Sequence, residues 1–560
     1  MKKRAYKLMK EWCDTVLSYK IETSSPYTDG ATMCPACHVA HGRIADLCFP
    51  LTVIWNTEGD ERYLKEADKL IDWTEFNLKS PRGFWYNDAG NRWYCTTAFS
   101  ALAIGEALYH FGDVLPRCYY DKWKKLYFRL TDSVEKSVED EGIIPVSNYY
   151  CGFAANLAMA YKLTGERKYY DRAKFWADEA LRRFDEQGFF YGEGYPMQAS
   201  DGSHTIDMGY NMEESIPLLM RYASLTGEHI DFTRERMRDH LEFMLPDGAI
   251  DNSFGTRHNK WTYWGSRTSD GIVEGLALAL DDPMIADACE RALSIYEKFT
   301  HGGLLSMPMA EDAGEPTCLH HTFTHAKALA ALVIAENIPE IKRTVLPSEV
   351  DYKTKLFQNG RLILASNGEY RATFSACRAM RHPDFASNGG GSMNLLYHKD
   401  YGVIAAATSA EYVTTEPLDQ QYLRTADTSP CMTAQFIING EQACKDKEAT
   451  LSADGYCISA KAKLWQAKYT FEGSMLNIDL ECENGIYNIP IVASRGDRVT
   501  ISADKRHLSI NERLFIDSSR ELDVCPDERV FNQVGGFLYL PISIKVCGSE
   551  NLQIKVITNK

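Results

Sequence analysis

The sequence predicts an α+β multidomain protein: an (α/α)6 toroid, as a full or incomplete α/α barrel, followed by an antiparallel β-sandwich. Apolar residues recur at helical spacing up to about residue 340, whereas short alternating runs typical of strands take over from about residue 350. The 560 residues, 45% hydrophobic and 25% charged, are enough for two large folded units. We therefore assign 1–340 to the toroid, as the catalytic domain, and 350–560 to the sandwich.

The helical part repeats one sequence pattern: a polar cluster, an apolar run rich in Ala and Leu, a glycine, and a charged amphipathic segment. The apolar runs begin at His38, Cys95, Asn148, Tyr210, Thr268 and Cys318. The amphipathic segments include 2–20, 61–77, 167–184 and 232–243. A helix that is apolar on all sides must be buried, while one with a charged face lies outside it. Six inner and six outer helices are therefore expected.

The inner helices of such a ring run parallel, so their N-termini lie at one rim. The polar clusters precede these helices, and unsatisfied N–H groups favour anions there. In the second part, we expect strands at 357–365, 370–377, 402–408, 432–438, 469–480, 499–503 and 552–557. Pro339 and Pro347 interrupt the last helical segment and mark the boundary between the two parts.

Charge and hydropathy restrict the partners of the protein. Lys and Arg number 61 against 77 Asp and Glu, a net charge of −16, so we expect no nucleic-acid or membrane partner. The first residues are basic but lack an apolar signal region, which predicts a cytoplasmic location, or a periplasmic one if a leader was removed. The sixteen scattered cysteines also favour a reducing compartment. Whether the protein is a homo-oligomer stays open.

The densest polar cluster leads into the fourth and fifth inner helices. Glycoside hydrolysis needs two carboxyl groups flanking the scissile bond, one of them with a raised pKa. Glu213 and Glu214 lie about 100° apart on a helix, so only one of them is expected to face the lumen. Asp207 or Asp270 would then be the second carboxylate. Tyr210 shares a helix face with Glu214 and joins the catalytic candidates.

The same cluster supplies candidate substrate-binding groups. Arginine can bind a sugar carboxylate with two hydrogen bonds, and large aromatic rings can stack on a pyranose. The candidates here are Arg257, His258, Trp261, Tyr263, Trp264 and Arg267. The alternative interpretation is that Asp207 and Asp270 only cap helices and that the aromatic residues fill the centre of the ring.

Histidines form a second candidate group, because the first and sixth repeats would be neighbours in a closed ring. These residues are His38, His41, His320, His321 and His325. His321 and His325 are spaced for zinc, but no matched third ligand is evident and an HExxH motif is absent. We therefore expect them to hydrogen-bond sugar hydroxyls or a carboxylate.

The segment from Cys34 to His38 has the CxxCH form. Haem attachment would need export, a redox dithiol would be expected beside a βαβ unit, and structural zinc is usually accompanied by a second CxxC. None of these contexts is present in the sequence. We interpret the two cysteines as small packing residues beside His38, and we predict no metal and no cofactor.

A basic, glycine-rich loop at 378–392, which contains His382, follows the toroid closely in sequence. It could reach over the rim and complete a pocket, or it could be a surface loop without a role there.

The predicted architecture resembles the heparinase II/III-like superfamily. The phrases at 247–257, 260–271 and 320–327 look like those of its glycoside hydrolase family 154 branch, whose activity is β-glucuronidase. This resemblance implies an exo-acting hydrolase that releases a terminal uronic acid, β-D-glucuronic acid, from oligosaccharides. A uronate-containing oligosaccharide is accordingly the expected substrate.

The same superfamily implies an alternative, a polysaccharide lyase that uses a Tyr base and an Asn-His pair. Asn148 and Tyr210 could fill two of these positions, but Tyr149 follows Asn148 where the lyase pattern has His. His382 is the remaining support for this reading. A noncatalytic glycan-binding protein is a second alternative. The carboxylates near Tyr210 favour hydrolysis.

Overall fold

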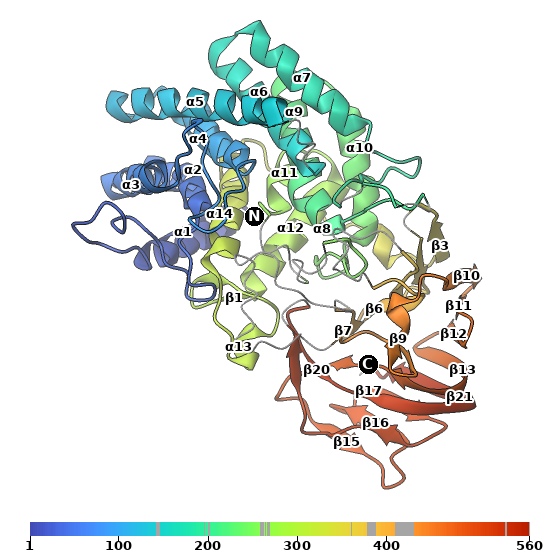
Figure 1. The fold of residues 1–560 in the computed structure, drawn as a ribbon. Coiled ribbons are helices and arrows are strands. Elements are labelled where there is room, and N and C mark those ends of the chain that lie inside the picture. The colour runs from blue at the N-terminus through green and yellow to red at the C-terminus, as the bar shows by residue number, and fades with distance from the viewer. Residues whose placement is uncertain are drawn as a thin grey trace.

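The computed structural model describes residues 1–141, 146–194, 197–199, 202–257, 263, 265, 269–359, 361–377, 388–408, 431–532 and 535–558. A helical N-terminal part is followed by an antiparallel β part (Figure 1). This is the predicted fold class. Within the described ranges, no helix is long and apolar enough to cross a membrane.

Six buried helices form the inner ring of the described toroid. They are α2 (Cys48–Glu58), α4 (Thr97–Phe111), α6 (Asn148–Thr164), α9 (Ile216–Thr226), α11 (Val273–Ala277) and α14 (Leu319–Ile334). Each packs against the next, and α14 packs against both α11 and α2, so the ring is closed. Every described residue of α6 from Asn148 to Ala160 is buried, as expected for a helix surrounded by others.

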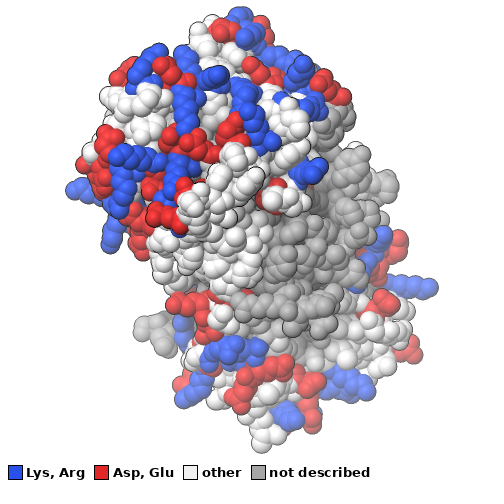
Figure 2. Space-filling model, turned by 60° about the vertical axis from the view of Figure 1, so that its left-hand side comes forward, with Lys and Arg blue, Asp and Glu red and all other residues white. Residues whose placement is uncertain are grey.

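Amphipathic helices surround this ring. They are α1 (Lys2–Ser18), α3 (Glu61–Leu78), α5 (Arg117–Glu141), α7 (Arg167–Leu181), α10 (Ile230–His240) and α12 (Pro283–Lys298). In α3, the side chain of Asp60 caps the N-terminus, and Tyr63, Leu64 and Ala67 lie on the buried face. Figure 2 shows cationic and anionic residues interspersed over the helical part. The predicted alternation of inner and outer helices is confirmed.

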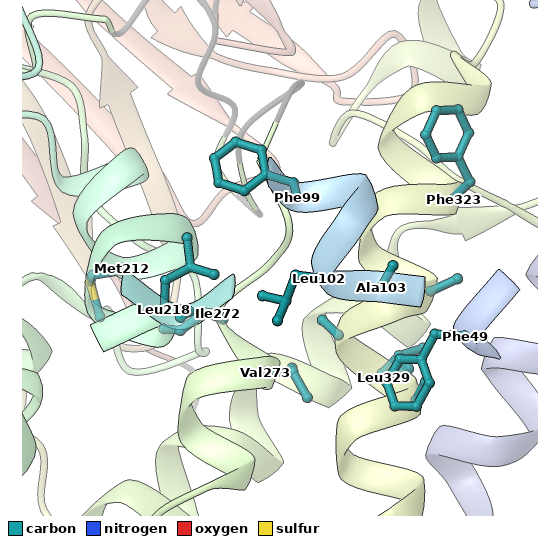
Figure 3. Close-up of a cluster of buried hydrophobic side chains, with 14 of the residues drawn as sticks. Phe49, Phe99, Leu102, Ala103, Met212, Leu218, Ile272, Val273, Phe323 and Leu329 are labelled. Atoms are coloured by element: carbon teal, nitrogen blue, oxygen red, sulfur yellow. The ribbon is translucent and has the colours of Figure 1, made fainter. Parts of the chain in front are cut away.

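The apolar core of the ring is drawn from helices far apart in sequence. Figure 3 shows Phe49 of α2, Leu102 of α4, Leu218 of α9, Val273 of α11 and Leu329 of α14 gathered in one cluster. All five side chains are buried. Because each inner helix contributes to one shared cluster, the helices have little freedom to shift independently.

Short elements connect the ring helices and position several polar residues. They are η1 (Gly42–Leu47), α8 (Met208–Tyr210), η2 (Asn211–Ser215), η3 (Leu241–Phe243), β1 (Thr300–His301), β2 (Leu304–Leu305), α13 (Ala310–Ala313) and η5 (Pro347–Glu349).

The β part begins with a five-stranded antiparallel sheet in sequential order. Its strands are β3 (Lys353–Phe357), β4 (Leu362–Ser366), β5 (Tyr370–Ser375), β6 (Ser392–His398) and β7 (Gly402–Ala406). All residues of β4, β5 and β6 are buried. Since both faces of these strands are covered, this sheet is the layer between the toroid and the rest of the β part.

A larger sheet packs on the other side. Its main path is β10 (Thr450–Asp454), β11 (Cys457–Lys461), β12 (Trp465–Glu472), β13 (Met475–Asn488), β21 (Ser543–Val556), β17 (Leu514–Ser518), β16 (His507–Ile510) and β15 (Val499–Ile501). Shorter elements are β8 (Gln435–Ile438), β9 (Glu441–Gln442), η6 (Ala443–Lys445), β14 (Ile491–Val492), β18 (Leu522–Asp523), β19 (Val530–Asn532) and β20 (Phe537–Leu540). The strand β12 alternates strictly between buried and partly exposed residues, as a strand with one covered face should.

Two of the strand predictions each joined two strands, and the prediction at 552–557 covers only the end of β21. The segment 357–365 contains the end of β3 and the start of β4, and 469–480 contains the end of β12 and the start of β13. The second reversal lies at Gly473, whose φ of 55° falls in the left-handed region that favours glycine. A tight reversal occupies so few residues that the apolar alternation continues across it, and pattern reading joins the two strands.

Polar contacts join the five-stranded sheet to the toroid. Arg371 of β5 donates from Nη2 to the carbonyl of Glu242 at 2.6 Å, and Lys355 of β3 lies 2.6 Å from the Glu242 carboxylate. Thr373 donates to Asp251. Arg371 is only 2% exposed. Because Arg371 and Thr373 are shielded from water, unlike Lys355, whose side chain is 39% exposed, losing a partner of either buried group leaves it without a substitute.

Arg371 also pairs with the carboxylate of Glu242, at 3.6 Å. We expect Arg371→Met to destabilise the fold by about 3–5 kcal/mol, the usual cost of removing one partner of a buried ion pair. Arg498→Met is the matched control, because Arg498 pairs with Glu512 at the surface with 67% of its side chain exposed, and we expect about 1 kcal/mol or less there. Urea denaturation measures both variants. Equal midpoints for the two would contradict a structural role for the Arg371 contacts.

Candidate functional site

Polar side chains gather where the N-termini of the inner helices meet. Asn148 is the first residue of α6, Asp207 caps α8, and Asp270 precedes α11. Glu213 and Glu214 lie in η2, directly before α9. All five side chains are buried, so each needs a partner inside the protein. The predicted collection of polar groups at one rim is therefore present in the structure.

The turn η2 is a π-helical turn between α8 and α9, and it directs both of its glutamates inward. Glu214 accepts a hydrogen bond from Nδ2 of Asn148. Glu213 accepts one from Ser269, and its carboxylate lies 3.6 Å from Nε2 of His325. The expectation that only one glutamate faces the inside was wrong, because it assumed the 100° step of a regular α-helix.

Two cations neutralise the carboxylates beside Glu214. Arg43 of η1 contacts both Asp46, at 2.6 Å, and Asp270, while Lys327 of α14 lies 2.5 Å from Asp270. None of these four side chains is more than 3% exposed. The contacts link the first, fifth and sixth repeats.

These charges set the protonation of Glu214 and Asp270 in opposite directions. Burial, reinforced by the negative charge of Asp270, raises the pKa of Glu214 to about 8 against the opposing effects of Arg43 and Asn148. Burial would also raise the pKa of Asp270, but Arg43 and Lys327 outweigh it and lower that pKa. At neutral pH, Glu214 is therefore a neutral acid that can donate a hydrogen bond, and Asp270 is an anion.

A third set of contacts joins Asn148 to Tyr210. The guanidinium carbon of Arg257 lies 3.8 Å from the centre of the Tyr210 ring. Arg257 also donates to Glu193 at 3.1 Å, and the other oxygen of Glu193 accepts the backbone N–H of Asn148 at 2.7 Å. Glu193 is fully buried, and burial raises its pKa. Asn148, Tyr210, Arg257, Glu193 and Glu214 are called the rim cluster below.

Asp207 has a structural role. Its Oδ1 accepts the backbone N–H of Tyr210 at 3.0 Å, and its Oδ2 accepts hydrogen bonds from Asn252 at 3.0 Å and from the backbone of Arg257 at 2.6 Å. The alternative reading of Asp207 as a helix cap is confirmed. Asp270, by contrast, is held by ion pairs rather than as a cap. Both carboxylates are therefore held by groups of the protein itself.

The aromatic and arginine candidates are only partly described. Tyr263 donates its hydroxyl to Asp247, and its ring packs 5.5 Å from that of Phe537, so it fills the junction with the β part. The hydroxyl of Tyr149 accepts a hydrogen bond from Trp93 at 2.6 Å. The remaining candidates, His258, Trp261, Trp264, Arg267 and His382, lie outside the described residues.

The predicted histidine group does assemble. The rings of His41 and His320 are 4.7 Å apart, and His320 stacks on Phe323. Burial and the neighbouring His41 hold the pKa of His320 well below its usual value. Nδ1 of His325 donates to the carbonyl of His321 at 2.7 Å, which turns Nε2 towards Glu213. His38 lies outside this group, with a left-handed φ of 55°.

Sequence reasoning missed Arg43, Asp46, Glu193 and Lys327. Three of them are charged residues inside runs that were predicted to be apolar on all sides. A charge in such a run must be paired, so Arg43, Asp46 and Lys327 could have been recognised as one buried group. Glu193 carries a weaker signal: it is flanked by Gly192 and Gly194 in a connection between helices.

Comparison with known proteins covers nearly the whole chain. The family described as "Ulvan lyase N-terminal domain" matches residues 9–349, and the "Ulvan lyase C-terminal domain" matches residues 354–559. A curated relative, the "Broad-specificity ulvan lyase" of Formosa agariphila, is 35% identical over 430 residues. That alignment covers 74% of this chain and 67% of the relative.

Solved structures share the fold at low sequence identity. The chondroitin AC lyase of Streptomyces coelicolor A3 has a TM-score of 0.57 at 11% identity, covering 100% of this chain and 80% of that one. Heparinase III has a TM-score of 0.54 at 12% identity, covering 96% and 79%. These similarities support the toroid-plus-sandwich architecture.

The predicted branch within the superfamily, a glycoside hydrolase, was wrong. The matches of both domains and the identity of the curated relative overturn the assignment to glycoside hydrolase family 154, and with it the prediction of a β-glucuronidase. Of the four carboxyl groups that suggested hydrolysis, Asp207 caps a helix and Asp270 lies in buried ion pairs. The chain carries the two ulvan lyase domains in order along its length, and it belongs to the ulvan lyase family.

Proposed function

We propose that this protein is a polysaccharide lyase that cleaves a uronate-containing polysaccharide, of the ulvan type, by β-elimination. The observation that carries the proposal is the rim cluster. In it, the guanidinium of Arg257 lies over the ring of Tyr210, and Glu193 links Arg257 to Asn148, whose amide donates to the neutral Glu214. The family and the activity named for the Formosa agariphila relative support it. The lyase was the alternative in the sequence reading.

The reaction removes the C5 proton of a uronate and expels the oxygen on C4. The electron pair of the C5–H bond forms the C4=C5 double bond as the C4–O bond breaks. Negative charge develops on the carboxylate of the sugar in the transition state, so hydrogen-bond donors at that carboxylate lower the barrier. Neutral Glu214 and the amide of Asn148 are such donors in the rim cluster.

Tyr210 is the base in this proposal. The positive charge of Arg257 beside its ring favours the phenolate, the form that accepts the C5 proton. The resulting phenol can return that proton to the departing C4 oxygen, so one side chain serves both steps. Glu193 acts as a positioning residue, because it holds Arg257 and the backbone of Asn148 at once.

We expect Tyr210→Phe to lower kcat by about 10²–10⁴-fold, the usual contribution of a general base. The assay follows the ultraviolet absorbance of the C4=C5 double bond formed from a uronate polysaccharide. Tyr222→Phe is the control, because Tyr222 is a buried tyrosine of α9 whose hydroxyl instead donates to Glu228. Full activity of Tyr210→Phe would refute the assigned base.

We expect the protonation of Glu214 to shape the alkaline side of the pH profile. With a pKa of about 8, Glu214 loses its proton and its donor role as the pH rises through that value, so kcat should fall there. Glu214→Gln retains an N–H donor that does not titrate. This variant should remain active at neutral pH and lose that part of the alkaline decline.

The raised pKa of Glu214 also makes the stability of the fold decrease as the pH rises. The pKa of Glu214 is raised in the folded state, so its contribution is fully present below the unfolded value near 4.5 and is lost as the pH rises towards 8. Glu214→Gln should flatten the pH dependence of the melting temperature across that window. An unchanged slope, together with an unchanged pH–rate profile, would count against a neutral Glu214.

Products distinguish elimination from other functions. We expect each cleavage to create an unsaturated, ultraviolet-absorbing end and one new reducing end. Release of saturated uronic acid without the ultraviolet band would contradict the proposal. Binding without turnover of any uronate polysaccharide would also contradict it.

A further inference from the structure

The CxxC segment does not stand alone in the folded protein. Cys34 and Cys37 lie in the connection between α1 and η1, His41 caps η1, and Cys318 caps α14. One ligand atom from each of these four residues lies within 4.8 Å of every other. All four side chains are at most 2% exposed.

The backbone holds this arrangement in a tight turn. The N–H of His38 donates to the carbonyl of Cys34 at 3.0 Å, and the N–H of Cys34 donates to the carbonyl of Val39 at 3.1 Å. A β-bridge between Met33 and Ala40 closes the turn. Because His38 takes a left-handed conformation at its tip, the chain reverses and brings His41 back beside Cys37.

Direct contacts converge on the sulfur atoms. Sγ of Cys37 lies 3.1 Å from Nε2 of His41. The backbone N–H of Leu319, in the first turn of α14, points at Sγ of Cys34 from 3.4 Å. An amide donor at a helix N-terminus favours a thiolate over a thiol, and thiolates are the form that binds metals.

We propose that Cys34, Cys37, His41 and Cys318 bind one Zn²⁺ ion in a closed Cys₃His site. Zn–S bonds of about 2.3 Å in a tetrahedron place neighbouring sulfurs roughly 3.8 Å apart, so four donor atoms within 4.8 Å of one another need little adjustment. Three thiolates and one imidazole are a common donor set for structural zinc. With all four positions filled by protein, the ion holds the fold and takes no part in the elimination.

The position of the site gives the ion a structural task. Cys34 and Leu319 are 285 residues apart, and the site joins the approach to the first inner-ring segment to the start of the last inner helix. The metal site therefore links the first and the last segments of the inner ring, which are neighbours in the closed ring. Arg43 is two residues from His41, and His320 is two residues from Cys318. Because Arg43 contacts Asp270, the ion also holds in place a segment of the functional site.

This inference departs from the sequence-based expectation of no metal. That expectation rested on the lack of a second CxxC, but His41 and Cys318 supply the other two ligands. The competing chemistry is a disulfide between Cys34 and Cys37, which would consume two of the proposed ligands.

The test is the zinc content of the full chain, measured by plasma mass spectrometry after expression with zinc and dialysis against a weak chelator. We expect about one zinc ion per chain in the wild-type protein and in Cys289→Ser, and about a tenth of that or less in Cys318→Ser. Cys289 is the matched control, a buried cysteine of α12 outside the cluster.

A second measurement avoids dependence on how a variant folds. Replacing zinc by Co²⁺ in the wild-type chain should produce sulfur-to-cobalt charge-transfer bands and the visible bands of a tetrahedral site. Removing the metal with a strong chelator should lower the melting temperature. Wild-type protein without stoichiometric zinc, or with an intact mass two hydrogens lower than the reduced chain, would overturn the proposal. Full zinc occupancy in Cys318→Ser would overturn it equally.

Discussion

Burial of the inner helices is the constraint on which the rest of this structure depends. A helix surrounded by other helices can carry a polar side chain along its length only where that side chain finds a partner, as Lys327 of α14 does, so many polar groups lie at the helix ends. In α6, Asn148 stands at the N-terminus, and the buried residues that follow it are mostly apolar, with Asn156 hydrogen-bonded to Thr131. Six parallel helices under the same constraint bring their polar ends together, and this produces a concentrated cluster far from bulk water.

Charge balance within that cluster determines what each carboxyl group can do. Arg43 and Lys327 neutralise Asp270, while Glu214 beside them is held in its neutral form. Carboxyl groups of the same type thus become an anion and an acid, depending on which cations lie nearby. A neutral Glu214 can donate a hydrogen bond to a uronate carboxylate, which is the role that the proposed elimination gives it.

The β part contributes to the same arrangement by covering one end of the toroid. The three central strands of its five-stranded sheet are buried on both faces, and Arg371 and Thr373 connect it to segments that lead towards the rim cluster. Asp251, the partner of Thr373, adjoins Asn252, which binds Asp207. Hydrogen bonds on two neighbouring residues, Asp251 and Asn252, therefore connect the sheet to the cap at the N-terminus of the turn that carries Tyr210.

The sequence by itself determined the features that depend on local periodicity: alternating buried and amphipathic helices and the change to strands near residue 350. These follow from which faces of an element must avoid water, and that information lies within a few turns of the chain. Only the tertiary structure decided the partners of Asp270, the neutral state of Glu214 and the meeting of Cys34 with Cys318. Such contacts join repeats up to 285 residues apart, and their energies depend on distances that a single sequence does not contain.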